Sequence, residues 1–186
     1  MTRQHSIASI LFPLQLVLLM WCSFFIGGWL KVDFGFLGIE PRTLIGLIGI
    51  FMAPLIHGNF SHLISNAIPV LFLGSSLYFF YPIGAKWMFA QCYLLTNILV
   101  WFFGRPFSHI GASGLVYSLA FLLIFIGIFD RQFKTILISA IILFSYGGLL
   151  YSAFDINQAV SWESHLFGAL VGITVAFVSS NLRRST

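Results

Sequence analysis

Long apolar segments alternate with short polar ones along almost the whole chain. Six of them have the length of about 17 to 25 residues that a helix needs to cross the hydrocarbon core of a bilayer. They lie at residues 7–30, 61–81, 86–104, 113–129, 132–154 and 164–182. We therefore predict an all-α membrane protein, a bundle of six transmembrane helices that forms a single domain over residues 1–186.

Two apolar stretches need a closer look. Residues 44–56 would reach only about 20 Å as a helix, which is too short for a span, so we expect an interfacial or re-entrant part of the first loop. Residues 7–30 exceed the apolar core of a signal peptide and have no clear cleavage site before Lys31, which favours a retained helix. Cys22 and Cys92 fall at different depths in this arrangement and should not form a disulfide.

Composition and charge support a membrane location. With 59% hydrophobic and 8% charged residues, the chain lacks the polar surface of a soluble domain. No basic cluster interleaved with aromatics suggests binding to nucleic acid. With the amino terminus inside, six basic residues face the cytoplasm (Arg3, Lys86, Arg131, Lys134, Arg183, Arg184) and three face outward (Lys31, Arg42, Arg105). This bias predicts that both termini are cytoplasmic.

In this topology, polar residues gather at one level of the bundle. The second, fourth and sixth helices all begin at the outer face, and His62, Ser113 and His165 lie close to their starts. A transporter would instead distribute polar groups along a path across the bilayer. Ionisable residues inside a membrane are costly, so the cluster is a functional-site hypothesis.

Ser113 is a candidate nucleophile. Gly111 and Gly114 allow a loop to turn sharply into a helix and bring backbone amides close to a bound carbonyl. The pattern resembles, without matching, the Gly-x-Ser-x-Gly turn of soluble hydrolases. Small residues at this position also serve close helix packing, and that alternative stays open.

His165 is a candidate general base, because a neutral imidazole in a low-dielectric site can accept the serine proton. Ser164, Gly168 and Gly172 form a row of small residues suited to tight packing of its helix. In the alternative interpretation, His165 only donates a hydrogen bond to a neighbouring helix. We predict a Ser/His dyad.

His62 and Asn66 are four residues apart and therefore share one face of the second helix. Both side chains can donate hydrogen bonds to a tetrahedral oxyanion, although they can also bond each other or a water.

Other chemistry has less support. His57 and His62 lie on different helical faces and lack the Glu of a His-Glu-x-x-His site, so the sequence predicts no metal and no cofactor. Asp130 lies at the inner surface, too far from Ser113 to complete a triad. Asp155 and Glu163 fall in the outer loop, where a carboxylate that orients His165 is compatible with the pattern but not required by it.

Taken together, these residues are similar to a known family. Residues 57–66, residues 111–114 with Tyr117, and residues 163–168 with Gly172 resemble the rhomboid intramembrane serine proteases, in order and on the expected helices. The resemblance extends over nearly the whole chain.

The resemblance implies a six-helix fold with Ser113 as nucleophile and His165 as general base. It also implies that His62, Asn66 and the backbone amide of Ser113 form the oxyanion site. The same analogy makes Gly111 and Ala112 the turn before the nucleophile and Tyr117 the ring that supports the imidazole of His165.

Part of the first loop departs from the family pattern. The Trp-Arg pair of some members is absent, so we assign no catalytic role to Arg42, and we interpret His57 and His109 as structural residues.

The expected function is that of an intramembrane serine endopeptidase that cleaves transmembrane helices of protein substrates near the outer face. Its partners would be these substrates and the lipid bilayer, and it would reside in a bacterial cytoplasmic membrane. By analogy, substrates would enter through the fifth helix and the loop at residues 151–162. The alternative is a catalytically inactive rhomboid-like protein that binds transmembrane helices.

Overall fold

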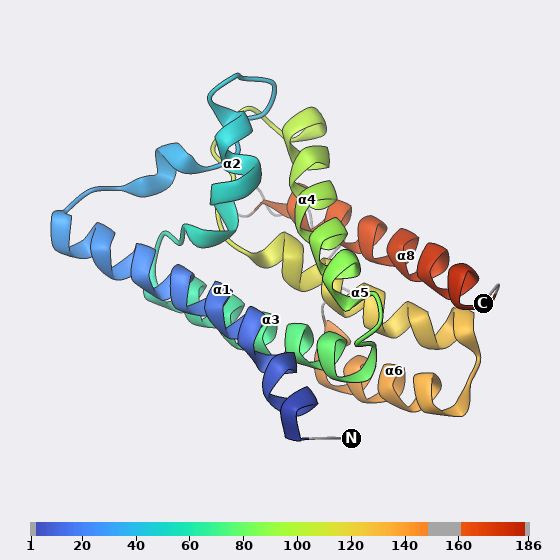
Figure 1. Cartoon of the computed structure of the whole chain (residues 1–186). Helices are drawn as coiled ribbons and strands as arrows, with labels where there is room; N and C mark the ends of the chain where they lie inside the picture. The colour runs from blue at the N-terminus through green and yellow to red at the C-terminus, as the bar shows by residue number, and fades with distance from the viewer. Residues whose placement is uncertain (1–2, 149–160, 185–186) are drawn as a thin grey trace.

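The computed structural model describes residues 3–148 and 161–184, with side chains from residue 10 onward. The described residues are almost entirely helical (Figure 1). The elements are α1 (Arg3–Leu30), η1 (Phe34–Leu37), α2 (Gly46–Met52), η2 (Ala53–Leu55), α3 (Phe60–Phe80), α4 (Ala85–Phe103), α5 (Ser113–Asp130), α6 (Phe133–Tyr146) and α8 (Trp162–Arg184). Within these ranges, strand-like pairing is limited to one antiparallel bridge between Ile39 and His109.

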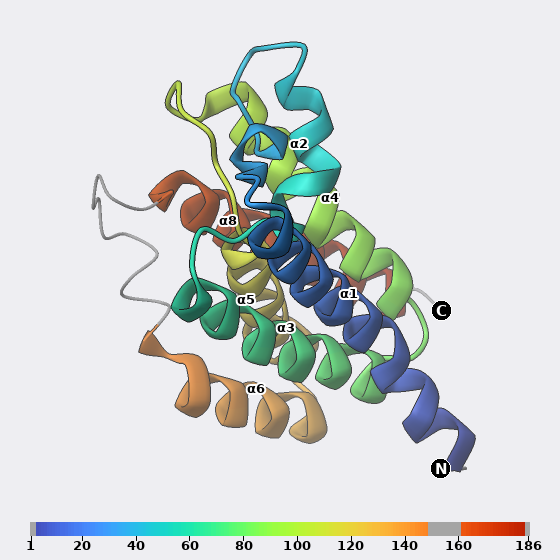
Figure 2. The same cartoon turned by 90° about the vertical axis from the view of Figure 1, so that its left-hand side faces the viewer.

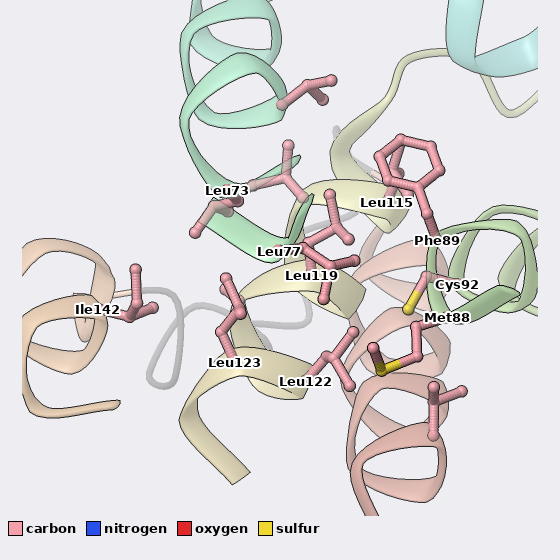
Figure 3. Close-up of a cluster of buried hydrophobic side chains, with 14 of the residues drawn as sticks. Leu73, Leu77, Met88, Phe89, Cys92, Leu115, Leu119, Leu122, Leu123 and Ile142 are labelled. Atoms are coloured by element: carbon pink, nitrogen blue, oxygen red, sulfur yellow. The ribbon is translucent and has the colours of Figure 1, made fainter. Parts of the chain in front are cut away.

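Helix α5 is the centre of the bundle. It lies between α3, α6 and α8, while α1 runs beside α3 (Figures 1 and 2). Its sequence is apolar on every face, which is the pattern of a helix surrounded by protein. Figure 3 shows leucines of α5 meeting side chains from α3, α4 and α6, among them Leu73, Phe89 and Ile142. The central position of α5 explains why its first residue can be enclosed by neighbouring helices.

Two glycines of α8 bring it against α5. A Cβ atom at Gly168 would collide with the carbonyl oxygen of Gly114, and one at Gly172 would collide with the carbonyl oxygen of Ser118. Backbone approaches of this kind occur where small residues line a helix contact in membranes. The row of small residues therefore has the packing function that its spacing predicts.

Four helices are long and apolar enough to cross a membrane: α1 from Ile10, α3, α5 and α8. The chain is thus a multi-pass membrane protein. Helix α4 agrees with the expected segment at 86–104 but is more polar, with Gln91, Thr96 and Asn97 in its middle. Helix α6 is described over 14 residues, and the rest of the segment expected at 132–154 includes residues outside the described ranges. The six-span count and the inward termini stay predictions.

The stretch at 44–56 forms α2 and η2, which are too short to span a membrane. Polar side chains of α4 hold this part of the first loop. Tyr93, Asn97 and Trp101 donate hydrogen bonds to the backbone carbonyls of Phe51, Ile50 and Thr43, at 2.6, 2.9 and 2.9 Å. These contacts explain why α4 carries polar residues that a lipid-facing helix would lack.

Arg42 anchors the same loop to the end of α4. Its guanidinium donates to the carbonyl oxygens of Phe102 and Gly104, at 3.1 and 2.9 Å. The first loop is thereby fixed to the segment that leads from α4 towards Ser113.

Candidate active site

Three helices begin around one cavity of about 690 Å³. Ser113 is the first residue of α5, His62 the third of α3 and His165 the fourth of α8. The cavity is lined by Asn59, Ser61, His62, Ser65, Asn66, Phe107, Ser108, His109, Ile110, Ser113, Val116, Tyr117, Ser161 and His165. All five polar or aromatic residues predicted for the site from sequence therefore face a common space.

The turn before Ser113 requires glycine at position 111. Gly111 has a φ of +100°, and its N–H donates to the carbonyl oxygen of Ala53 at 2.9 Å. A Cβ atom there would lie 2.5 Å from Nε2 of His62. Both the backbone conformation and the contact with His62 thus exclude a side chain.

The backbone N–H of Ser113 is well placed to stabilise an oxyanion. The first N–H groups of a helix have no acceptor within the helix, and the helix dipole places partial positive charge at that end. Because α5 begins at Ser113, its amide is one of these groups. A developing oxyanion in the cavity would find backbone donors beside the hydroxyl.

The ring of Tyr117 stacks on the imidazole of His165. The ring centroids are 4.2 Å apart and the planes differ by 8°. Tyr117 lies one turn after Ser113 on α5, so the nucleophile candidate and the ring beneath the imidazole belong to one helix. The close approach at Gly168, three residues after His165, allows this stacking across the two helices.

His62 and Asn66 approach the cavity from α3. The Asn59 side chain caps α3 by accepting from the His62 backbone N–H at 2.8 Å. The Asn66 amide donates to the carbonyl oxygen of His62 at 2.8 Å, which uses one of its two N–H bonds. The second N–H is left for a ligand in the cavity.

His57 lies just before α3, next to His62. The two ring centroids are 5.0 Å apart, and the His57 side chain is buried. Burial, assisted by the neighbouring His62, lowers the pKa of His57 to about 4. His57 is therefore neutral near pH 7, and it lines a different cavity, between the carboxyl-terminal end of α1 and the first loop.

The sequence placed Glu163 in the outer loop, and the structure corrects this. Glu163 lies in the first turn of α8, nearly fully buried, where it forms an ion pair with Arg105. The two partners are 58 residues apart, so no local pattern in the sequence could have paired them. The other carboxylate, Asp155, lies outside the described residues.

Two further expectations from the sequence concern Asp130 and the two cysteines. Asp130, at the last residue of α5, pairs with Arg183 near the end of α8, with Oδ2 and Nη2 2.9 Å apart. Cys22 and Cys92 are both free thiols, as their separation in depth predicts.

Comparison with known proteins adds family information. The Rhomboid domain model matches residues 45–182, a range that contains every residue assigned to the cavity. The chain is 39% identical over 153 residues to the uncharacterized protein Rv1337 of Mycobacterium tuberculosis (strain H37Rv), covering 77% of this chain and 63% of the relative. It is 37% identical over 159 residues to the uncharacterized protein ML1171 of Mycobacterium leprae, covering 80% of this chain and 62% of the relative. The chain thus spans less than two thirds of the length of these relatives.

Proposed function

Because this chain belongs to the rhomboid family, we propose that it is an intramembrane serine endopeptidase that acts through Ser113 and His165. The observation that carries the proposal is the shared cavity, to which α5 contributes a serine at its first residue and α8 a histidine stacked on Tyr117. Peptide hydrolysis by a serine enzyme needs a nucleophile, a base and oxyanion donors within one site, and side chains of all three kinds line this cavity.

In the proposed mechanism, the Ser113 hydroxyl attacks a peptide carbonyl of the substrate. His165 takes the proton from Oγ and later gives it to the leaving amine. A water then attacks the acyl-enzyme, with His165 again accepting a proton, and Ser113 is restored. The stacked Tyr117 ring would hold the imidazole in one orientation through both steps.

The tetrahedral intermediate carries a negative oxygen that must be stabilised. The Ser113 backbone N–H at the start of α5, the free amide N–H of Asn66 and the His62 ring are the proposed donors. Gly111 and Ala112 shape the turn that presents the first of these, and the contact between Gly111 and His62 keeps the ring beside it.

A lateral opening between α3 and α6 is the proposed substrate entrance. A cleft of about 460 Å³ lies there, lined by Ile64, Ser65, Ile68, Pro69, Phe72, Ser145 and Tyr146. Ser65 lines both this cleft and the cavity that contains Ser113. The rings of Phe72 and Tyr146 stack across the cleft with centroids 5.7 Å apart. Separation of this pair would connect the bilayer with the candidate site. The loop at residues 151–162, which the sequence also associated with entry, lies almost wholly outside the described residues.

The substrate class follows from the chemistry. A helix hides its carbonyls in its own hydrogen bonds, so a substrate must unwind before Ser113 can attack. We expect cleavage near the outer end of single-span substrates that carry Gly or Pro there, with small side chains at the cut. Replacement of these residues by Leu should slow cleavage, and unchanged cleavage would contradict this preference.

The test of the proposed function is cleavage of a model single-span substrate in liposomes by the wild type, Ser113→Ala and His165→Ala. The expected result is cleavage by the wild type and its loss in both variants, with unchanged thermal unfolding. Cleavage that persists in a variant would remove that residue from the mechanism. Failure of the folded wild type across several substrates would favour an inactive protein that binds transmembrane helices.

A further inference from the structure

The segment before Ser113 and the first turn before His165 are joined by a dense set of polar contacts. Oε1 of Glu163 accepts from the Arg105 backbone N–H at 3.2 Å and from Nε of Arg105, and Oε2 accepts from Nη2 of Arg105 at 3.1 Å. The Glu163 side chain is 3% exposed, whereas that of Arg105 is 32% exposed. A buried carboxylate with a forked arginine partner has one well-defined geometry.

Aromatic rings enclose the arginine. The guanidinium carbon of Arg105 lies 4.9 Å from the ring centroid of Phe107 and 5.7 Å from that of Trp162. One ring belongs to the segment before Ser113 and the other to the first residue of α8. The ion pair is therefore held from both sides of the junction.

A second chain of hydrogen bonds runs parallel to the ion pair. Nε2 of His109 lies 3.0 Å from the carbonyl oxygen of Arg105, which can only accept, so Nε2 carries the hydrogen. Burial lowers the pKa of His109, which leaves Nδ1 free to accept from the Ser161 hydroxyl at 2.5 Å. Ser161 in turn accepts from the Ser164 hydroxyl at 2.6 Å. Every donor in this chain then has an acceptor.

The partners in these contacts adjoin the candidate dyad. Ser164 directly precedes His165, and a Cβ atom at Gly114, the residue after Ser113, would lie 3.2 Å from the Ser164 carbonyl oxygen. The contacts of Gly168 with Gly114 and of Gly172 with Ser118 set the distance between the helix axes. The polar contacts of Arg105, Glu163, Ser161 and Ser164 add a second constraint at the start of α8.

We propose that Arg105 and Glu163, assisted by His109, Ser161 and Ser164, are positioning residues that set the place of His165 relative to Ser113. This inference rests on the proposed function. It assigns the ion pair to catalysis through geometry, because a displacement of about 1 Å between reacting groups can cost about 100-fold in rate. Neither Arg105 nor Glu163 lines the cavity.

The structure provides a matched control at the other end of the same helices. Asp130 and Arg183 form an ion pair of the same type, also with one buried carboxylate, which has no contact with the cavity. Removal of either pair should lower thermal stability, but only the loss of the outer pair should change the chemical step.

The experiment measures kcat and KM for cleavage of a model single-span substrate in liposomes. Glu163→Gln keeps the shape of the carboxylate, Arg105→Lys keeps the charge without the fork, and Asp130→Asn is the control. We expect kcat to fall about tenfold or more in the first two variants with KM within about twofold. The kcat of Asp130→Asn should stay within about twofold of the wild type at a similarly lowered unfolding temperature.

The outcomes separate the two proposals. Ser113-dependent cleavage with the same kcat in Glu163→Gln, Arg105→Lys and Asp130→Asn would overturn the positioning role alone. Absence of Ser113-dependent cleavage in the wild type would overturn the proposed function and the positioning role with it. If the first two variants do not fold, Ser164→Ala decides the question, because it removes one hydroxyl that does not line the cavity: a kcat lowered about threefold supports the role, and an unchanged kcat overturns it.

Discussion

An ion pair between an arginine and a buried carboxylate lies near each end of the contact between α5 and α8, but the surroundings of the two pairs differ. At the end far from the cavity, Asp130 and Arg183 join the last turns of the two helices, and the guanidinium carbon lies 5.4 Å from the ring centroid of Tyr81. At the cavity end, Arg105 and Glu163 join a loop to a helix start beside a cavity of about 690 Å³. A pair that links two helix ends stabilises the bundle, whereas one beside a polar cavity also orients the groups within it.

The direction of the helices reinforces this difference. The cavity end holds the first residues of α3, α5 and α8, where the partial positive charge of a helix start favours negative charge. The far end holds the last turns of α5 and α8, where the cationic Arg183 matches the opposite sign of the dipole. An oxyanion would therefore be stabilised at the cavity end, which is also the end with the serine and the histidine.

A substitution that separates α5 and α8 along their whole contact should have the most severe consequence. Gly168→Leu would drive a side chain into the carbonyl of Gly114. We expect loss of cleavage by about 100-fold or more together with a lower yield of folded protein. Gly28→Leu is the control, because no atom lies within 4 Å of a Cβ at that exposed position on α1. If Gly168→Leu and Gly28→Leu had the same cleavage rate and the same unfolding temperature, the result would contradict a close contact of α5 at Gly168.

Removal of the ion pair between Asp130 and Arg183 should affect stability alone. Asp130→Asn leaves Arg183 without its carboxylate, and we expect a loss of about 3 kcal/mol in stability, at the lower end of the cost of breaking a buried pair. Thermal unfolding in detergent is the measurement, and cleavage at a temperature where the variant is folded should match the wild type. A large fall in kcat would show that the two ends are coupled.

Acid should destabilise the fold through His57, which lies just before α3. The pKa of His57 is lowered to about 4 in the folded protein, so the unfolded chain takes up a proton near pH 6.5 while the folded chain does not. The contribution of neutral His57 to the free energy of unfolding is therefore fully present above about pH 6.5 and is lost as the pH drops towards 4. At pH 5 the loss is about 2 kcal/mol.

The variant that tests this pH dependence is His57→Gln. Its unfolding temperature should fall less steeply than that of the wild type between pH 7 and pH 5. Parallel curves for the two proteins would show that His57 does not carry the acid sensitivity.

The smallest expected effect concerns the ring beneath the imidazole. Tyr117→Leu removes the stacking partner of His165, and we expect kcat to fall about tenfold, equivalent to about 1.4 kcal/mol. Tyr117→Phe keeps the ring and should retain more activity than Tyr117→Leu. Kinetics with one model substrate distinguish the two, and a reversed order would contradict a role for stacking.

Local patterns predicted the helices and the candidate residues that line the cavity. Apolar runs located α1, α3, α5 and α8 within a few residues, because a bilayer imposes length and hydropathy on each span. The small-residue spacing at Gly168 and Gly172 predicted a packing face, because residues four apart lie on one side of a helix.

Contacts between distant segments were harder to predict. Nothing local pairs Arg105 with Glu163, because the partners are 58 residues apart and their contact depends on how α4 and α8 approach. The hydrogen bonds from α4 to the loop carbonyls were equally hard to predict. The side chains that donate them make α4 more polar than a helix that only spans the membrane. Periodicity describes the face of a helix but not the partner that covers it.

If Ser113 is a nucleophile activated by His165, it should react with an electrophilic serine probe. Covalent labelling of the folded protein with a fluorophosphonate, followed by mass spectrometry of the modified peptide, measures this reactivity. We expect a label on Ser113 in the wild type and in Asp130→Asn, and none in His165→Ala. Labelling of another serine, or none on Ser113 in the folded wild type, would contradict it.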